Sequence, residues 1–226
     1  MKQGIWTCFL GSMAVLAVLV VAVLPVTAWA MSAGDHNARG RDYVRQGELD
    51  KAVGEFTAAI QVDPNSVRAY NNRGGVYVAL QKYEQALGDF DQALTLNPSY
   101  AKGYNNRAYV YVKMGKFDLA VAEVEKALNI GPVEATFYDT RGYAYTGRGM
   151  IDEALQDLSK AINMDSTLAT AYFHRAEVYD KTGRMSEAQR DYGNYIKYAT
   201  DDKNDADLAT AKRRYTEITR MAPDVK

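Results

Sequence analysis

Residues 83–98 read YEQALGDFDQALTLNP, and residues 117–132, further along the chain, read FDLAVAEVEKALNIGP. Both segments end in a proline, and their apolar residues recur at matching places. The spacing i, i+3, i+4, i+7 places side chains on one face of an α-helix, and in the first segment it is met by Tyr83, Ala86, Leu87, Phe90, Ala93 and Leu94. The two segments therefore predict two copies of one amphipathic helix, each stopped by its proline.

This pattern recurs every 34 residues along most of the chain, as Pro64, Pro98 and Pro132 show, with Ser166 at the place of a fourth proline. Each period holds two helical segments around a short polar turn. The same register carries four series: Tyr70, Tyr104, Tyr138 and Tyr172; Tyr43, Tyr77, Tyr111, Tyr145 and Tyr179; Ala52, Ala86, Ala120, Ala154 and Ala188; and Ala59, Ala93, Ala127 and Ala161, with Tyr195 at the fifth place. Five such periods predict a stack of helix pairs.

The repeated unit resembles the tetratricopeptide repeat. It has an aromatic residue early in the first helix, a small residue such as Gly74 or Gly142, a tyrosine, and then alanine, a bulky apolar residue, alanine and proline. The resemblance covers residues 34–200 and implies an all-α, right-handed superhelical solenoid of antiparallel helix pairs. It also implies that the first helices line a concave groove that holds a peptide or a helix of a partner. The end units depart from the pattern, since His36 replaces the aromatic residue and the fifth unit has no proline.

After the repeats, residues 200–204 are polar and helical spacing then resumes with Leu208, Ala211, Tyr215 and Ile218. This spacing predicts a helix that covers the open end of the last repeat, with Lys212, Arg213 and Arg214 facing water. The predicted boundaries are an N-terminal segment at 1–30, five repeats at 33–66, 67–100, 101–134, 135–168 and 169–200, and a capping helix at 205–221.

The N-terminal segment has the order of a secretory signal peptide. Lys2 is its only charge, residues 5–24 are almost wholly apolar, and Ala28 and Ala30 suit cleavage before Met31. This favours an exported protein, in a bacterial periplasm. The alternative is an uncleaved inner-membrane anchor, because an apolar run of about 18 to 20 residues is long enough to span a bilayer.

Composition and motifs argue against several functions. The net charge is −1 with no basic run, which excludes the usual footprint of a nucleic-acid binder. The only cysteine, Cys8, lies in the N-terminal segment, and His36 and His174 are far apart in the chain. Since there is also no Gly-rich phosphate loop and no nucleophile elbow, we expect no enzyme activity, no cofactor and no metal site.

Arginine and acidic residues recur together in every unit. A catalytic group is needed once, so a pair that is copied in each repeat indicates a structural ladder rather than an active site. We predict ion pairs between Arg39 and Glu55, Arg73 and Asp89, Arg107 and Glu123, Arg141 and Asp157, and Arg175 and Asp191.

The groove residues, by contrast, vary from unit to unit, as a binding surface requires. Asparagine amides can hold the backbone of an extended peptide, and aromatic side chains add contact area. The alternative is that these are ordinary solvated helix faces. The geometry of the family assigns to the groove Arg68, Asn71, Asn72, Lys102, Asn105, Asn106, Tyr109, Asp139, Thr140, Tyr143, Phe173 and His174.

The sequence therefore predicts an exported adaptor or scaffold that binds a peptide or a partner protein in its groove. Two alternatives stay open: a structural protein that assembles into head-to-tail homo-oligomers, and a membrane-anchored assembly factor. The carboxylate clamp by which some members of the family hold chaperone tails is not expected, because only Asn72 and Lys102 agree with its residues. We expect contact with a membrane only if the N-terminal segment is retained.

Overall fold

The structure of the chain is a computed structural model that describes residues 31–199 and 206–221. The described residues from Ser32 onward belong to one compact unit. The predicted signal segment at residues 1–30 and the polar stretch at residues 200–204 lie outside the described residues. The helices described below all belong to this unit.

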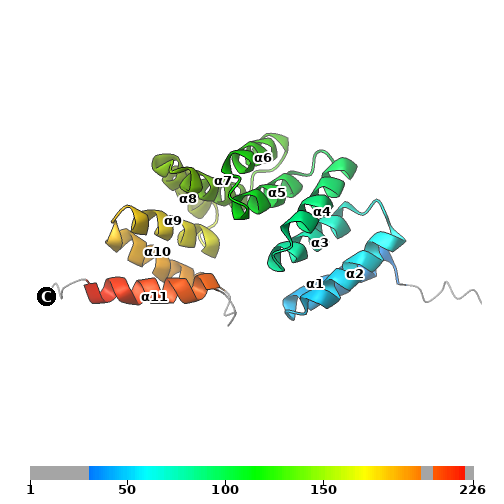
Figure 1. Cartoon of the computed structure of the whole chain (residues 1–226), viewed down its shortest axis with the longest axis horizontal. Coiled ribbons are helices and arrows are strands. Elements are labelled where there is room, and N and C mark those ends of the chain that lie inside the picture. The colour runs from blue at the N-terminus through cyan, green and yellow to red at the C-terminus, as the bar shows by residue number, and fades with distance from the viewer. Residues whose placement is uncertain (1–30, 200–205, 222–226) are drawn as a thin grey trace, which may run out of the picture. The chain divides into compact units, whose positions relative to one another are not determined.

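The described residues form α-helices and no strand, which confirms the predicted all-α fold (Figure 1). The helices are α1 (Ala33–Arg45), α2 (Leu49–Val62), α3 (Val67–Ala79), α4 (Tyr83–Leu96), α5 (Ala101–Lys113), α6 (Phe117–Ile130), α7 (Ala135–Arg148), α8 (Ile151–Met164), α9 (Ala169–Lys181), α10 (Met185–Tyr198) and α11 (Ala206–Met221).

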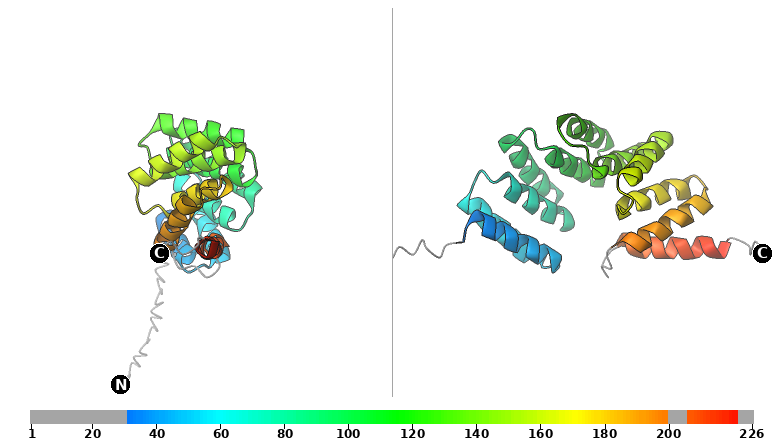
Figure 2. Two further views of the ribbon diagram at one scale, coloured as in Figure 1. Left: turned by 90° about the vertical axis from the view of Figure 1, so that its left-hand side faces the viewer. Right: turned by 180° about the vertical axis from the view of Figure 1, so that it is seen from behind.

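Each odd-numbered helix from α1 to α9 packs against the next even-numbered helix, and each pair packs against the next pair. Figure 2 shows from two further sides that the pairs are stacked in chain order. The odd-numbered helices also contact one another from pair to pair. This arrangement is a solenoid whose odd-numbered helices share one face.

Small residues set the spacing inside and between the pairs. Ala86 and Ala93 of α4 are fully buried, as are the alanines at the equivalent places of the other units. Phe90 lies between them and packs against Gly74 of α3, where an added Cβ would lie 2.7 Å from the Phe90 ring. The alanines and the glycine therefore let the two helices approach closely, and the ring fills the space between them.

The turns inside the pairs need a backbone with positive φ. Gly47, Gly115, Gly149 and Gly183 have φ between 71° and 75°, as expected for glycines that end a helix. Gln81 holds the same place in the second unit with φ of 57°. This turn is formed without a glycine, at the steric cost that the left-handed region imposes on an L-residue.

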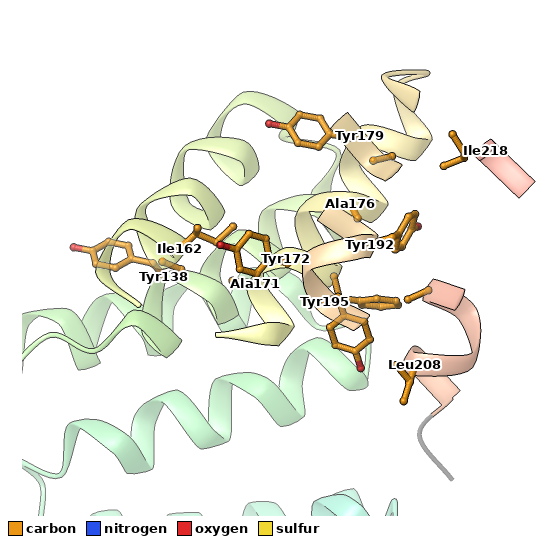
Figure 3. Close-up of a cluster of buried hydrophobic side chains, with 14 residues drawn as sticks. Tyr138, Ile162, Ala171, Tyr172, Ala176, Tyr179, Tyr192, Tyr195, Leu208 and Ile218 are labelled. Atoms are coloured by element: carbon orange, nitrogen blue, oxygen red, sulfur yellow. The ribbon is translucent and has the colours of Figure 1, made fainter. Parts of the chain in front are cut away.

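Helix α11 covers the end of the last repeat. Leu208, Ala211 and Ile218 are buried and join a cluster that includes Tyr192 and Tyr195 of α10 (Figure 3). Tyr195 stands where the earlier units have alanine, and α11 covers it.

One prediction for this helix was wrong. Arg214 does not face water: its side chain is 22% exposed, and its Nε donates a 2.7 Å hydrogen bond to Asp180 of α9. Lys212 and Arg213 are exposed as expected. The difference arises because Asp180 lies at the end of α9, within reach of α11, so the arginine ties α11 to the preceding pair.

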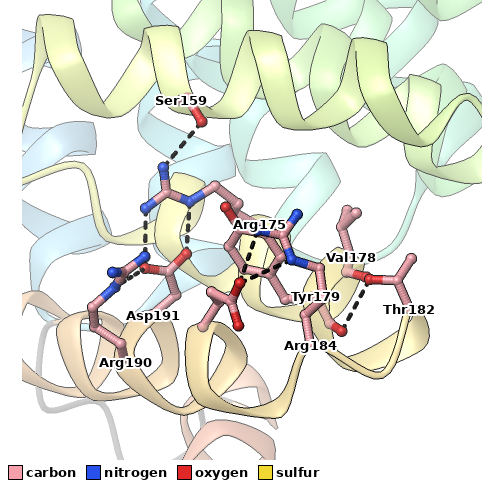
Figure 4. A network of polar contacts seen from close by, with 9 residues as sticks. Ser159, Arg175, Val178, Tyr179, Thr182, Arg184, Arg190 and Asp191 are labelled. Atoms are coloured by element: carbon pink, nitrogen blue, oxygen red, sulfur yellow. Dashed lines mark hydrogen bonds and ion pairs between the residues drawn. The ribbon is translucent and has the colours of Figure 1, made fainter.

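The five predicted arginine–acid pairs are all present, and we call them the arginine ladder. Arg141 is bound to Asp157 by hydrogen bonds of 2.6 and 3.0 Å, and Arg175 to Asp191 in the same way (Figure 4). In the first unit the pair is looser, since Arg39 is half exposed and lies 3.3 Å from Glu55.

Several ladder arginines also reach the preceding unit. Arg73 donates to Thr57, Arg107 to Asp91 and Arg175 to Ser159, in each case a residue of the previous even-numbered helix. One guanidinium therefore joins both helices of its own pair to the pair before it. This is a stacking device repeated along the solenoid, and it leaves the odd-numbered face free.

Candidate functional site

Two pockets open on the face formed by the odd-numbered helices. The first pocket has a volume of about 430 Å³ and lies between α1, α3 and α5, against side chains of α2. Its lining is Arg41, Val44, Arg45, Leu49, Phe56, Asn71, Asn72, Gly75, Val76, Ala79 and Asn106.

The second pocket has a volume of about 320 Å³ and lies along α3, α5, α7 and α9. It is lined by Gly75, Val78, Phe90, Asn105, Asn106, Tyr109, Thr136, Asp139, Thr140, Thr170 and His174. Gly75 and Asn106 belong to both pockets, so the two form one continuous groove along the odd-numbered helices from α1 to α9. An added Cβ at Gly75 would meet nothing within 4 Å, which leaves this junction open.

A row of polar side chains crosses the groove, and we call it the groove row. Each step joins a residue of one odd-numbered helix to the residue 35 places later on the next. Asn72 donates to Asn37 at 3.4 Å and Asn106 donates to Asn71 at 2.8 Å. At the far end, Nδ1 of His174 lies 2.8 Å from the Asp139 carboxylate, which the Thr170 hydroxyl also contacts; these steps hold neighbouring units in register.

One step of the groove row is missing. Asn105 stands where it would meet Thr140, but the Thr140 hydroxyl donates to the backbone carbonyl of Thr136 instead. Oδ1 of Asn105 is left buried without a hydrogen-bond partner, in a residue that is 7% exposed. An unsatisfied buried polar atom costs about 1–3 kcal/mol. The gap lies in the lining of the second pocket.

Aromatic side chains and a lysine stand beside this pocket. The Tyr143 ring is stacked on the His174 ring with a centroid distance of 4.0 Å. The Lys113 ammonium lies 5.2 Å from the Tyr109 ring and 5.5 Å from the Tyr143 ring. Burial raises the pKa of both tyrosines, so both hydroxyls keep their protons at neutral pH. The pocket therefore offers neutral hydroxyls, amides and ring faces, with one cation at its edge.

The structure brings most of the predicted groove residues together. The pockets are lined by Asn71, Asn72, Asn105, Asn106, Tyr109, Asp139, Thr140 and His174. Four others lie outside the linings: Arg68 is exposed, Lys102 is paired with Glu134 at 3.0 Å, the Tyr143 ring is stacked on the His174 ring, and Phe173 is buried.

Phe173 requires a correction. Its side chain is 5% exposed and packs against Tyr195 and Tyr192 in the core cluster under α11. It does not line the groove. The equivalent places in earlier units hold polar residues such as Asn105 and Asp139, and the aromatic side chain turns instead toward the apolar residues of α10.

The sequence-based assignment also missed residues at the N-terminal end of the groove. Arg41, Val44 and Arg45 of α1 line the first pocket, and Gly75 lies at the junction. A signal for them exists in the repeat register, since Arg41 and Gly75 are equivalent to Tyr109. Extending the groove positions to the first unit, and one helical turn further along each helix, would have found them.

The described part of the chain has no candidate for a metal site or a membrane span. There, no group of three or more histidine, cysteine, aspartate or glutamate side chains could hold a metal ion. The helices from α1 to α11 are also too short or too polar to cross a membrane.

Helix pairs stacked in a row, with a groove along one face, are the arrangement of a solenoid binding protein. Tetratricopeptide repeat models match residues 37–101, 90–122, 142–183 and 169–202. The chain belongs to the tetratricopeptide repeat family and, as such, is a scaffold for protein–protein interaction and not an enzyme. A comparison with curated protein sequences gives no significant match.

Solved structures of tetratricopeptide repeat proteins share this fold. TTC0263 of Thermus thermophilus superposes with a TM-score of 0.72 at 21% identity, over 83% of this chain and 99% of its own. The type IV pilus biogenesis factor PilW gives 0.67 at 19% identity, over 84% and 91%. YrrB, described as having an unusual peptide-binding site, gives 0.51 at 21% identity, over 80% and 92%.

Proposed function

We propose that this protein is an exported adaptor that binds a segment of a partner protein in the groove formed by the two pockets. The observation that carries the proposal is the missing step of the groove row at Asn105. A buried amide oxygen without a partner weakens the fold, and a ligand N–H or O–H group that donates a hydrogen bond to it would remove that cost.

The surroundings of Asn105 suit a polypeptide ligand. Asn106 and Asn72 add amide groups along the same line, and an amide can pair with either group of a peptide bond. Tyr109 lies beside them and supplies apolar area with a polar tip, which is typical of residues that anchor interfaces. YrrB, which shares the fold, is described as having an unusual peptide-binding site, and this likeness favours the binding of a peptide here.

Export rests on the sequence of residues 1–30. A cleaved signal peptide would release the solenoid into a bacterial periplasm, and a retained segment would make the protein a membrane-anchored assembly factor. Mass spectrometry of the N-terminus of the protein purified from its native host would separate these two outcomes, since only cleavage yields a chain that begins near Met31.

Site-specific photo-crosslinking in the native host tests groove binding. A benzoyl-phenylalanine at Tyr109, which lines the second pocket, is expected to capture a partner protein. The matched control carries the same group at Leu119 of α6, which is 50% exposed and lies outside both pocket linings. Capture at Tyr109 is expected to disappear when Asn105 is changed to Ala.

The outcome decides between the open alternatives. Equal capture from both positions, or capture that survives Asn105→Ala, would contradict groove binding. If the captured protein is only a second copy of this chain, head-to-tail assembly replaces the adaptor as the function, and the mass of the purified protein will rise with concentration.

A further inference from the structure

The first pocket combines an apolar floor with a cationic rim. Leu49, Phe56 and Val76 form apolar parts of its lining, and Arg41 and Arg45 stand on α1. The lining contains no carboxylate. A pocket of this kind accepts an apolar side chain and attracts a negative charge next to it.

The two arginines are available to a ligand. Arg41 is exposed and has no ion pair within the described part of the chain. Arg45 is 74% exposed and is paired with Asp42 on its own helix, whose carboxylate is 53% exposed. A pair that is solvated to this extent contributes little, so a better placed carboxylate can take over the guanidinium. The arginine ladder differs in this respect, because its guanidinium groups are already bound.

The groove is also asymmetric in charge. The only carboxylate in the lining of the second pocket is Asp139, and both His174 and Thr170 already contact it. The α1 end of the groove therefore has two arginines in its lining, whereas the second pocket has no cation in its lining and one, Lys113, at its edge beside Tyr109. A ligand that spans both pockets would be oriented by this difference.

We infer that the first pocket recognises an internal partner segment in which an apolar side chain is next to an acidic residue. The apolar side chain fills the space over Phe56 and Val76, and the carboxylate binds Arg41 and Arg45. This inference rests on the proposed function and specifies its ligand. An internal acidic side chain is sufficient, so no free C-terminus is required.

A displayed library of random peptides, each fused to the display protein at both ends, is the probe for this inference. The full chain is used for selection, and selected peptides are then made with both termini blocked. We expect the enriched sequences to contain Asp or Glu within a few residues of a large apolar residue. Their affinity is expected to fall as the salt concentration rises, because exposed charge pairs are screened.

Charge reversal at the rim gives the decisive comparison. The variant Arg41→Glu/Arg45→Glu is expected to bind the selected peptides at least about tenfold more weakly than the unchanged protein. The control Lys82→Glu/Lys116→Glu changes the net charge equally at exposed residues that precede α4 and α6, and it is expected to bind normally.

Four other outcomes would overturn the inference. Selected peptides without acidic enrichment, or peptides that bind the rim variant as tightly as the unchanged protein, would contradict it while their loss in Asn105→Ala still supports groove binding. Equal losses in the rim variant and the control would show a non-specific charge effect. If no peptide binds the full chain at all, the inference fails together with the proposed function.

Discussion

The arginine ladder and the groove row both run the length of the solenoid, but they differ in how faithfully they are copied. The ladder has its ion pair in each of the five units. The groove row has hydrogen bonds at the α1–α3, α3–α5 and α7–α9 steps and a gap at Asn105. The feature that every unit repeats serves stacking, and we propose that the place that departs from the repeat is where a ligand is recognised.

Breaking the ladder should have the largest effect on stability. Arg141→Leu keeps the apolar stem but leaves the Asp157 carboxylate, which is 7% exposed, without its partner. Removing one member of a buried ion pair costs about 3–5 kcal/mol, and urea unfolding followed by circular dichroism measures the loss.

The matched control lies on the same helix. Arg148→Leu removes an ion pair with Asp118, a residue whose side chain is 86% exposed, and should change stability by less than about 1 kcal/mol. If the two variants lose equally little stability, the ladder is not a stacking device.

Two adjacent glycines of α3 sharpen the comparison. Gly74→Ala places a Cβ 2.7 Å from the Phe90 ring and should lower the free energy of unfolding by about 1–3 kcal/mol. In Gly75→Ala the added Cβ meets no atom within 4 Å, so better helix propensity should raise the free energy of unfolding by about 0.5–1 kcal/mol. Thermal unfolding of the two variants measures both changes. Because Gly75 lies where the two pockets meet, Gly75→Ala should be more stable than the unchanged protein and yet bind the selected peptides more weakly. Unchanged peptide affinity would show that the bound peptide does not contact this junction.

The attachment of α11 should depend on pH. Hydrogen bonds from Arg214 hold the pKa of Asp180 below its usual value. The carboxylate therefore contributes stability above its unfolded pKa of about 3.9, and this contribution is lost as the pH falls through the lower folded pKa. The protection of the α11 amides from hydrogen exchange, relative to their intrinsic exchange rates, should fall below about pH 4 in the unchanged protein. In Asp180→Asn this protection should be low already at pH 6, and protection equal to that of the unchanged protein would refute the role of the pair.

The sequence predicts the fold well because the solenoid is periodic. One unit repeated at 34 residues determines the helix pairs, the buried alanines and the partners of each ladder arginine, as the pair of Arg141 and Asp157 illustrates. Most interactions that hold the stack join neighbouring units, so a local pattern is sufficient. The prediction for Arg214 was wrong because its partner Asp180 lies 34 residues earlier, on a helix outside the capping segment.

The side chains of the groove are less predictable, because the repeat register does not determine their orientation. Register places a residue on the groove side of its helix, but packing decides which way the side chain turns. Phe173 turns into the core because α10 offers Tyr195 and Tyr192 to it. The unpartnered state of Asn105 could not be predicted either, since it depends on the rotamer by which Thr140 binds its own helix.

The smallest expected change in stability tests the central claim most directly. Asn105→Ala removes a buried amide oxygen that has no partner, and the packing lost with the larger side chain offsets most of that gain, so the free energy of unfolding should stay within about 0.5 kcal/mol of the unchanged protein or rise slightly. The same variant should bind selected peptides at least about tenfold more weakly in a fluorescence anisotropy titration. A variant that loses more than about 1 kcal/mol of stability and still binds the peptides normally would contradict the account, because Asn105 would then serve the stack and not the groove.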